Sequence, residues 1–505
     1  MSNTFMNGLQ MASNYTRTEN GALTHKTTTN TLLDLFAMGA AYRTRSEEDC
    51  ILLFRNAFAE NPTYALKCLF YIADVRGGQG ERRFFRICIN DLAKTHPEVV
   101  RRNLELIPIY RRWDDLYALM DTPLENAAFL FMKKQLALDV QSKTPSLLGK
   151  WLKSENASSK ETKALAIRTR KAFGMTAKQY RKTLSYLRER INVLERLMSA
   201  GKWDEIEFDK IPSRAGLIYK NAFARHDVER AKSEKNVQTY ADFAKDTTKS
   251  VNAEVLNPVD IANKAFHMSY SDETGRAMLD KYWMNLKDYY NGREENGIAV
   301  CDVSGSMTGE PMNAAVSMSA YIAERGKGPF QNHFITFSAN PQLIKFEGVD
   351  IYDKFSRAVK ADWGMNTNIE ATMDLLLRTA IENNVSPEDL PTRLYIFSDM
   401  EFDSCMTSGP ISTGRWGDRN ALIDNHNKDT LFEMIEKKWR AHGYEMPKII
   451  FWNLDARTQN IPALGGRFSY VSGFSMTMVE NILSGKDGYA LMMEKLNTPR
   501  YECIH

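Results

Sequence analysis

Residues 298–307 read Ile-Ala-Val-Cys-Asp-Val-Ser-Gly-Ser-Met, a short apolar run followed by a polar turn. The four apolar residues predict a buried strand. Asp302, Ser304 and Ser306 follow at every second position, and Gly305 permits a tight turn between the two serines. The stretch therefore predicts a strand that delivers one carboxylate and two hydroxyls to the edge of a sheet.

Three further apolar runs follow in the C-terminal part of the chain and alternate with helical patterns. The apolar runs are residues 333–337, 394–397 and 449–454. The helical patterns are residues 312–324, 369–382 and 430–442. Strands that alternate with helices are typical of a doubly wound, Rossmann-like α/β sheet. In such a sheet, ligands bind outside the carboxyl ends of the strands.

Polar residues at these carboxyl ends could share one metal ion. The run 394–397 leads into Ser398 and Asp399, which brings a second carboxylate to the edge that holds Asp302. Thr367 adds a hydroxyl just before a predicted helix. Carboxylate and hydroxyl oxygens, completed by water to a six-fold shell, suit Mg²⁺ or Mn²⁺ rather than Zn²⁺. The alternative interpretation treats the serines as helix caps and Asp399 as a turn residue after a strand.

The motif Asp302-x-Ser304-x-Ser306, followed by Thr367 and Asp399, resembles the metal-ion-dependent adhesion site (MIDAS) of von Willebrand factor A (vWA) domains. The resemblance implies that the two serines and the threonine bind the ion directly. The two aspartates would bind it directly or through water. An acidic group from a protein partner would take the open position.

The N-terminal part is predicted to be helical. Its clearest pattern is residues 177–198, where apolar residues recur at steps of three and four. Shorter helices are predicted at residues 31–39, 48–59, 63–74, 83–95, 99–106 and 113–120. The breaks between them hold Asn-Pro, Gly-Gly or His-Pro, which stop helices. Many short helices in series predict a HEAT-like solenoid of stacked helical hairpins.

Three segments of the helical part, together with the vWA-like part, resemble the Ro autoantigen proteins, and their bacterial and phage relatives in particular. The segments are DVRGGQGER at 74–82, IYRRWDDL at 109–116 and KWLKSEN at 150–156. Ro proteins carry a TROVE module, a ring of helical repeats that a vWA domain closes. The middle of the helical part does not align with them, so their RNA-contacting residues cannot be transferred.

The Ro resemblance implies both an architecture and a partner. It implies a TROVE-like helical ring at 1–290, a vWA domain at 295–485, and a tail at 486–505 that packs back through Leu496 and Tyr501. Single-stranded RNA ends would thread a basic central hole, and small structured RNA would bind the outer rim.

The charge of the chain is unevenly distributed. Residues 1–300 hold 46 Lys and Arg against 37 Asp and Glu, whereas residues 301–505 hold 20 against 26. Residues 141–200 are the densest basic stretch, with 14 against four. Basic side chains neutralise phosphates, and aromatic side chains between them can stack on unpaired bases. The RNA-binding candidates are Lys163, Arg168, Arg170, Lys171, Lys178, Arg181, Lys182, Arg188 and Arg190.

That basic stretch has a plainer interpretation, because charged residues on helices often form only a solvated face, and Tyr180 lies on the apolar stripe. The loop at 76–83 is likewise either a turn between repeats or a phosphate contact through Arg76. It lacks the G-x-x-x-x-G-K-[ST] pattern of nucleotide hydrolases.

Other classes of protein are disfavoured by missing patterns. The six cysteines include no C-x-x-C pair, no run reaches the ~18 apolar residues of a membrane span, and the N-terminus shows no apolar signal segment. H-E-x-x-H and G-x-S-x-G are absent. We therefore expect a cytoplasmic, monomeric, non-catalytic RNA-binding ring protein with a Mg²⁺ site. The alternatives are a metal-dependent protein-interaction scaffold without nucleic acid and, as a minor case, metal-assisted phosphodiester cleavage.

Overall fold

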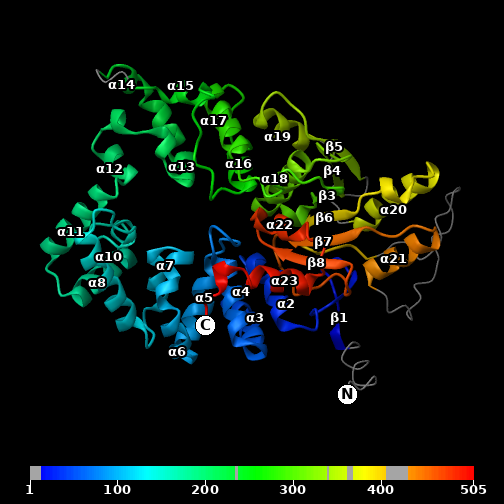
Figure 1. Ribbon diagram of the computed structural model, residues 1–505, viewed down its shortest axis with the longest axis horizontal. Coiled ribbons are helices and arrows are strands. Elements are labelled where there is room, and N and C mark those ends of the chain that lie inside the picture. Colours follow the sequence, from blue (N-terminus) through cyan, green and yellow to red (C-terminus); the bar gives the residue numbers. More distant parts are fainter. Residues whose placement is uncertain (1–12, 234–236, 338–340, 361–367, 405–429) are drawn as a thin grey trace.

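The computed structural model describes residues 13–233, 237–337, 341–360, 368–404 and 430–505. Figure 1 shows a curved arm of helices that leaves an α/β domain on one side and returns to it on another. The arm comes from the N-terminal part of the chain and the α/β domain from the C-terminal part. The predicted combination of a helical part and an α/β part is confirmed.

The α/β domain is built on one six-stranded mixed sheet. Its strands are β3 Gly297–Asp302, β4 His333–Phe337, β5 Gln342–Lys345, β6 Arg393–Ser398, β7 Lys448–Asn453 and β8 Phe468–Ser472. The order across the sheet is β5-β4-β3-β6-β7-β8, and every neighbouring pair is parallel except β4 and β5. This is the doubly wound order, in which the chain reverses direction across the sheet between β3 and β6. The carboxyl ends of β3 and β6 therefore lie side by side.

The α/β domain contains α18 Glu310–Arg325, α19 Ile351–Val359, α20 Ile369–Glu382, α21 Leu431–Ala441, α22 Val479–Ile482 and α23 Gly488–Leu496, with the 3₁₀ helices η6 Gly305–Met307, η7 Pro387–Asp389, η8 Met476–Met478 and η9 Pro499–Tyr501. Helix α18 packs on β3, β4 and β6, and α23 packs on β8. The middle strands are buried along almost their whole length, as expected for parallel strands covered by helices.

The helical arm is a series of short helices. They are α2 Thr31–Met38, α3 Glu47–Glu60, α4 Pro62–Ala73, α5 Arg83–Thr95, α6 Pro97–Arg102, α7 Ile107–Tyr110, α8 Glu125–Gln141, α9 Leu148–Trp151, α10 Lys160–Phe173, α11 Ala177–Arg190, α12 Leu194–Ser199, α13 Ser213–Arg225, α14 Asp227–Ala231, α15 Tyr240–Lys245, α16 Pro258–Ala265 and α17 Glu273–Met284. The 3₁₀ helices of the arm are η1 Gly39–Ala41, η2 Leu104–Leu106, η3 Trp113–Leu119, η4 Trp203–Glu205 and η5 Phe208–Lys210.

Three details of the helical prediction are wrong. The single helix predicted at 177–198 is divided into α11 and α12, because Asn192 between them adopts a left-handed backbone with φ 48°. Asn tolerates this conformation better than most residues, so the apolar periodicity continues while the helix does not. The helix predicted at 99–106 is divided into α6 and the 3₁₀ helix η2. The helix predicted at 113–120 is the 3₁₀ helix η3.

Both ends of the arm contact the α/β domain (Figure 1). At the first end, α2 packs on β8, and the Ser472 hydroxyl donates to the carbonyl of Phe36 at 3.0 Å. At the second end, α16 packs on α18 and α17 on α19, and Arg276 forms an ion pair with Asp350. The path of the chain therefore closes on itself.

The glycine-rich loop between α4 and α5 is a packed turn. A Cβ at Gly78 would lie 1.8 Å from the carbonyl oxygen of Tyr71, so only glycine fits there. The Gly78 carbonyl accepts from Thr477 Oγ1 at 3.2 Å, and the Gln79 side chain accepts from the backbone N–H of Ser475 at 3.2 Å. The loop therefore belongs to the contact between the arm and the α/β domain.

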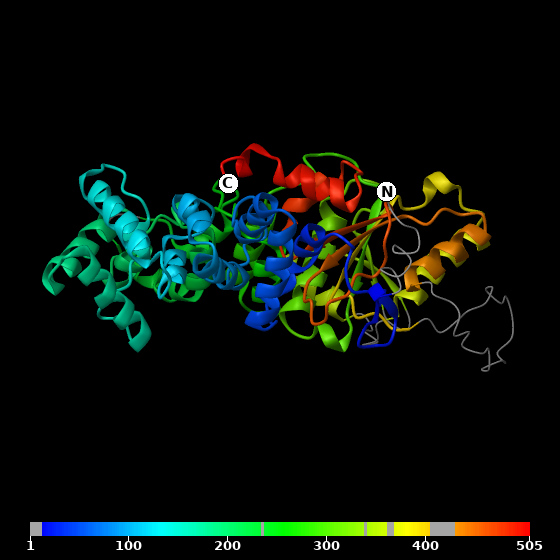
Figure 2. The same cartoon turned by 90° about the horizontal axis from the view of Figure 1, so that it is seen from below.

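The C-terminal tail lies over the first helices of the arm (Figure 2). Leu496 and Tyr501 are fully buried. Asp74, at the end of α4, is also fully buried, and it accepts from Arg500 Nη2 at 2.6 Å and from the Tyr501 hydroxyl at 3.1 Å. The Tyr501 ring stacks on Tyr110 at 5.7 Å between centroids. The tail therefore joins the end of the chain to its beginning.

A short hairpin precedes the helices. Strands β1 Tyr15–Arg17 and β2 Leu23–His25 pair antiparallel, and His25 forms an isolated bridge with Ile461. Thr18 donates from its hydroxyl to the carbonyl of Phe402 at 2.6 Å. The hairpin therefore packs on the α/β domain, although it lies in the part of the sequence predicted to be helical. None of the helices within the described ranges combines the length and hydrophobicity that crossing a bilayer requires.

We predict that Tyr501→Ala lowers the free energy of unfolding by roughly 3–5 kcal/mol, because it removes a fully buried aromatic ring. Tyr501→Phe is the matched control. It keeps the ring and removes only the hydrogen bond to Asp74, so we expect a loss of about 1 kcal/mol. Urea unfolding followed by circular dichroism measures both values. Equal stability of Tyr501→Ala and the wild type would show that the tail does not hold the arm.

Candidate functional site

The candidate metal site starts at Asp302, the last residue of β3. This side chain is fully buried. Its Oδ1 atom accepts from the backbone N–H of Ser304 at 2.9 Å, and its Oδ2 atom accepts from the Ser398 hydroxyl at 2.6 Å. Ser398 ends β6, so this second bond links the carboxyl ends of two neighbouring parallel strands. Asp302 is thereby held in one orientation.

The two serines of the turn lie against each other. Ser304 Oγ and Ser306 Oγ are 2.9 Å apart. Ser304 precedes η6, but its side chain makes no capping hydrogen bond, and α18 begins only at Glu310. The structure therefore gives no support to the interpretation of these serines as helix caps.

Asp399 follows β6 directly and is 1% exposed. Its Oδ1 atom accepts from the backbone N–H of Glu401 at 3.1 Å. Its Oδ2 atom is buried and has no hydrogen-bond partner within the described residues. The Nε atom of Arg457 lies 3.6 Å from this oxygen and forms an ion pair with it. Asp399 therefore presents one oxygen that could accept a further ligand.

The pKa values of both aspartates reflect their burial. Burial raises the pKa of Asp302 to about 7, with a further contribution from the negative charge of Asp399, against hydrogen bonds from Ser398 and Ser304. Burial also raises the pKa of Asp399. Two buried carboxylates that repel each other favour a proton or a cation between them. Such a pair, with two hydroxyls beside it, fits a hard divalent cation.

Four of the five predicted metal ligands therefore lie at one edge of the sheet: Asp302, Ser304, Ser306 and Asp399. Thr367 lies outside the described residues. Its neighbour Asn368 caps α20 by accepting from the backbone N–H of Ala371 at 2.9 Å. Among the described residues no group of three or more His, Cys, Asp and Glu could hold a metal, so a cation here would depend on hydroxyl and water oxygens.

The sequence analysis missed several polar residues around this edge. Ser398 orients Asp302, and Arg457 pairs with Asp399 from the segment after β7. Arg457 also forms an ion pair with Glu19 of the N-terminal hairpin. Buried Glu401 accepts from the backbone N–H of Glu19 at 2.7 Å. The place of Arg457 just beyond a strand was a usable signal, whereas the contact of Glu19 comes from the other end of the chain and gave none.

Four of the nine predicted RNA-binding residues have structural partners. Arg168 pairs with Asp121 and Glu125 on the preceding repeat. Arg188 is half-buried and donates to the carbonyls of Gly149 and Leu152 at 2.9 and 3.0 Å. Arg170 forms an ion pair with Glu155, and Arg190 donates to the carbonyl of Val140. These arginines hold the arm together.

The other five predicted residues are exposed on α10 and α11, and they make no ion pair or side-chain hydrogen bond within the described ranges. They are Lys163, Lys171, Lys178, Arg181 and Lys182. The last three are spaced three and four residues apart and so share one face of α11. Tyr180 is fully buried, as its place on the apolar stripe predicted. Arg181 also lines a cavity of about 650 Å³, together with Ser154, Asn156 and Arg188.

The two parts of the chain match two different family models. Residues 18–122 and 145–291 match a domain of unknown function, DUF2828, and residues 296–498 match another, DUF7788. Neither description names an activity. The two matches meet between the helical arm and β3, where the fold also changes.

Two individual proteins are similar over most of the chain. The uncharacterized protein L728 of Acanthamoeba polyphaga mimivirus is 29% identical over 513 residues, which cover 94% of this chain and 85% of that protein. The crystal structure of the Deinococcus radiodurans RO (RSR) protein aligns with 93% of this chain and 99% of that one, at 10% identity and a TM-score of 0.36. A structural likeness this weak supports no argument about shared fold or function.

We predict that Asp302→Asn stabilises the protein in the absence of divalent cations, and more so at higher pH. The pKa of Asp302 is raised from 3.8 to about 7 in the folded state. The contribution of Asp302 to the free energy of unfolding is therefore fully present below about pH 4 and is lost as the pH rises through 7. Asn does not ionise and escapes that loss. At about pH 8 we expect a gain on the order of 2–4 kcal/mol, since one pKa unit is ~1.4 kcal/mol.

Urea unfolding in a chelating buffer near pH 4 and near pH 8 measures this difference. Asp389→Asn is the control, because Asp389 is exposed in η7 of the same domain. A gain from Asp302→Asn that is equal at both pH values would contradict the assignment of a raised pKa to Asp302.

Proposed function

We propose that this protein is a non-catalytic RNA-binding protein, in which α10 and α11 hold RNA and the α/β domain binds Mg²⁺ or Mn²⁺. One observation carries the first half: Lys178, Arg181 and Lys182 are exposed on one face of α11 with no acidic partner within the described ranges. Lys163 and Lys171 add two more exposed cations on α10. A row of unpaired cations is the electrostatic footprint of a polyanion site.

The chemistry of these side chains fits the phosphates of RNA. The exposed set consists mainly of lysines, which meet phosphates as point charges. Binding would release counterions from the RNA, so the affinity would fall steeply with salt. Both single-stranded ends and small structured RNA remain candidate ligands. The charge pattern supports the RNA class rather than one RNA.

The edge of the sheet supports the second half of the proposal. Asp399 Oδ2 is a buried oxygen without a hydrogen-bond partner among the described residues, and the Ser304 and Ser306 hydroxyls lie close to it in the fold. A vWA-type domain would use such a site to capture an acidic side chain of a protein partner. A metal-dependent protein interaction is therefore the second candidate function, and it is compatible with the first.

The proposal that the site is non-catalytic rests on the sequence and on the number of predicted ions. H-E-x-x-H and G-x-S-x-G do not occur in the chain. Both carboxylates would be ligands of a single ion, which leaves no separate general base among the predicted site residues. Metal-assisted cleavage of labelled RNA, lost in Asp302→Ala, would contradict this part of the proposal.

We predict that reversing three charges, Lys178→Glu, Arg181→Glu and Lys182→Glu, weakens RNA binding by roughly 10- to 100-fold and lowers the salt dependence by about three counterions. Filter binding at two salt concentrations measures both. The control reverses Lys345, Arg357 and Lys360, which are exposed on the α/β domain and change the net charge equally. Binding that is absent in the wild type, independent of salt, or weakened equally by the control would refute the RNA site.

We predict that Asp302→Ala abolishes Mg²⁺ binding in calorimetric titration while the circular dichroism of the sheet persists. The same loss is expected for Asp399→Ala, because each variant removes one of the two carboxylates, and for Thr367→Ala on the sequence motif alone. Asp389→Ala, an exposed carboxylate elsewhere in the domain, should bind as the wild type does. Unchanged Mg²⁺ binding by Asp302→Ala would remove the ligand assignment.

A further inference from the structure

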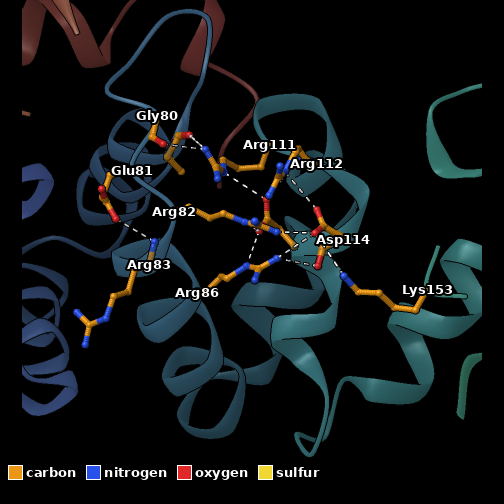
Figure 3. A network of polar contacts seen from close by, with 11 residues as sticks. Gly80, Glu81, Arg82, Arg83, Arg86, Arg111, Arg112, Asp114 and Lys153 are labelled. Carbon is orange, nitrogen blue, oxygen red and sulfur yellow. Dashed lines mark hydrogen bonds and ion pairs between the residues drawn. The ribbon is translucent and has the colours of Figure 1, made fainter. Parts of the chain in front are cut away.

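Three segments that lie far apart in the sequence meet at one place in the arm. They are the segments at 74–82, 109–116 and 150–156. Figure 3 shows side chains from all three converging on Asp114. Asp114 and Asp115 lie in the first turn of η3, and their side chains are 6% and 0% exposed. The two carboxylates form the centre of what we call the arginine cluster, whose cations are Arg82, Arg86, Arg111, Arg112 and Lys153.

Arg82 and Arg86 bind both carboxylates. Arg82 donates from Nε to Asp115 Oδ1 at 2.9 Å and from Nη2 to Asp114 Oδ2 at 2.5 Å. Arg86 donates from Nε to Asp115 Oδ1 at 2.5 Å and from Nη2 to the Asp114 carbonyl at 3.1 Å. The two guanidinium groups are therefore held side by side by the same pair of acids.

Arg111 has a structural task. Its side chain is 3% exposed, and Nη1 donates to the carbonyls of Ala73 and Gly80 at 2.8 and 3.1 Å. It thereby fixes the end of α4 and the glycine-rich turn. Burial lowers the pKa of Arg111, against the attraction of Asp115. Arg111 therefore stabilises the fold and is not a candidate ligand-binding group.

Arg112 and Lys153 are more loosely attached. Arg112 Nε lies 3.3 Å from Asp114 Oδ1, and Lys153 Nζ lies 3.6 Å from Asp114 Oδ2, and neither contact is a hydrogen bond. The Arg112 guanidinium lies 4.2 Å from the centre of the Trp151 ring, and Lys153 Nζ lies 5.3 Å from that of Tyr117. The aromatic faces position these two cations without neutralising them.

The arginine cluster carries more positive than negative charge. Five cations surround two carboxylates, and the neighbouring Glu81 is already paired with Arg43. If the cluster served only to join the three segments, two cations would be enough to neutralise the two carboxylates. Arg82, Arg86 and Lys153 all contact the single oxygen Asp114 Oδ2, so their charges repel at short range. An anion bound beside them would offset that repulsion.

Four of the five cations are accessible. The side chains of Arg82, Arg86, Arg112 and Lys153 are 33%, 35%, 31% and 24% exposed. A guanidinium has five N–H donors. The Nη1 groups of Arg82 and Arg86, and both Nη groups of Arg112, make no hydrogen bond to the part of the chain that the structure describes. These donors, arranged in planar forks, match the oxygens of a phosphate.

The arginine cluster also borders the exposed basic residues. The segment that supplies Lys153 continues into Ser154 and Asn156, which line the cavity of about 650 Å³. Arg181, on the basic face of α11, lines the same cavity. A chain of phosphates could therefore reach from the cluster to α11, which favours a polymer over an isolated anion.

We propose that Arg82, Arg86, Arg112 and Lys153 form a phosphate-binding site that takes a phosphodiester of single-stranded RNA. The choice of RNA rests on the proposed function, whereas the preference for phosphate rests on the surplus cations alone. Arg111 holds the segments together, whereas Arg82 both joins them through the two aspartates and offers its remaining Nη1 group. Arg86, Arg112 and Lys153 carry the positive charge that the two aspartates do not neutralise.

The test measures binding of a fluorescent single-stranded RNA to the full chain by anisotropy, at two salt concentrations. The variants are Lys153→Gln alone and Arg86→Gln with Lys153→Gln. Lys153→Gln removes no hydrogen bond of the cluster, so the fold is retained. The control is Arg55→Gln, because Arg55 sits in a charge-balanced pair with Asp91 on the same arm.

We expect about a tenfold loss of affinity for the double variant, and a salt dependence lowered by about two counterions, with no change for Arg55→Gln. Thermal unfolding of each variant accompanies the titration. Unchanged RNA affinity in the folded double variant overturns the site, and the RNA-binding proposal then stands if the α11 charge reversals still weaken binding.

If the wild type binds no RNA, the proposed function fails and a titration with a 5′-mononucleotide decides the phosphate site by itself. Mononucleotide binding that Lys153→Gln weakens supports a phosphate site with a different source of phosphate. Absence of binding to both RNA and mononucleotide overturns the phosphate site as well.

Discussion

The buried carboxylate of Asp74 holds the two ends of the chain together. It ends α4, has no exposed surface, and takes hydrogen bonds from Arg500 and Tyr501 of the tail. In an arm of stacked helices each element contacts mainly its neighbours, and the curvature follows from the small rotation between successive repeats. Attachment to the α/β domain at α2 and the tail, and again at α16 and α17, adds a constraint at both ends of the arm. Asp74 contributes to the first of these attachments, because its partners come from the far end of the sequence.

The fold was predictable where a buried element has a clear apolar pattern in the sequence. Strands β3, β4, β6 and β7 are apolar runs because the middle of a parallel sheet is covered on both faces. Strand β5 was missed because it is a short, half-exposed edge strand that pairs only with β4. Strand β8 was missed because its buried sequence contains Ser469 and Ser472, which are satisfied by backbone groups of other elements. The pattern of a short sequence segment does not show these hydrogen-bond partners, because they belong to other elements.

The candidate sites show the same division. The carboxyl edge was predictable, because parallel neighbours such as β3 and β6 must end side by side and so bring Asp302 and Asp399 together. The basic stretch was only partly predictable. Arg168 resembles an exposed cation in the sequence, yet it pairs with Asp121 and Glu125, which lie more than a helix away. Spacing along one helix identifies a face, but it does not show which acids of the next repeat cover that face.

The candidate metal site and the arginine cluster both hold charge that the protein only partly neutralises. The charge is negative at the metal site and positive in the cluster. At the edge of the sheet, two buried carboxylates have fewer cationic partners than charges, and their pKa values rise. In the arm, five cations surround two carboxylates whose side chains are almost completely buried. Folding the chain around uncompensated charge costs stability, and a bound ion of the opposite sign offsets that cost. A divalent cation fits the first place and a phosphate the second. Both ligands would therefore also stabilise the fold that holds them.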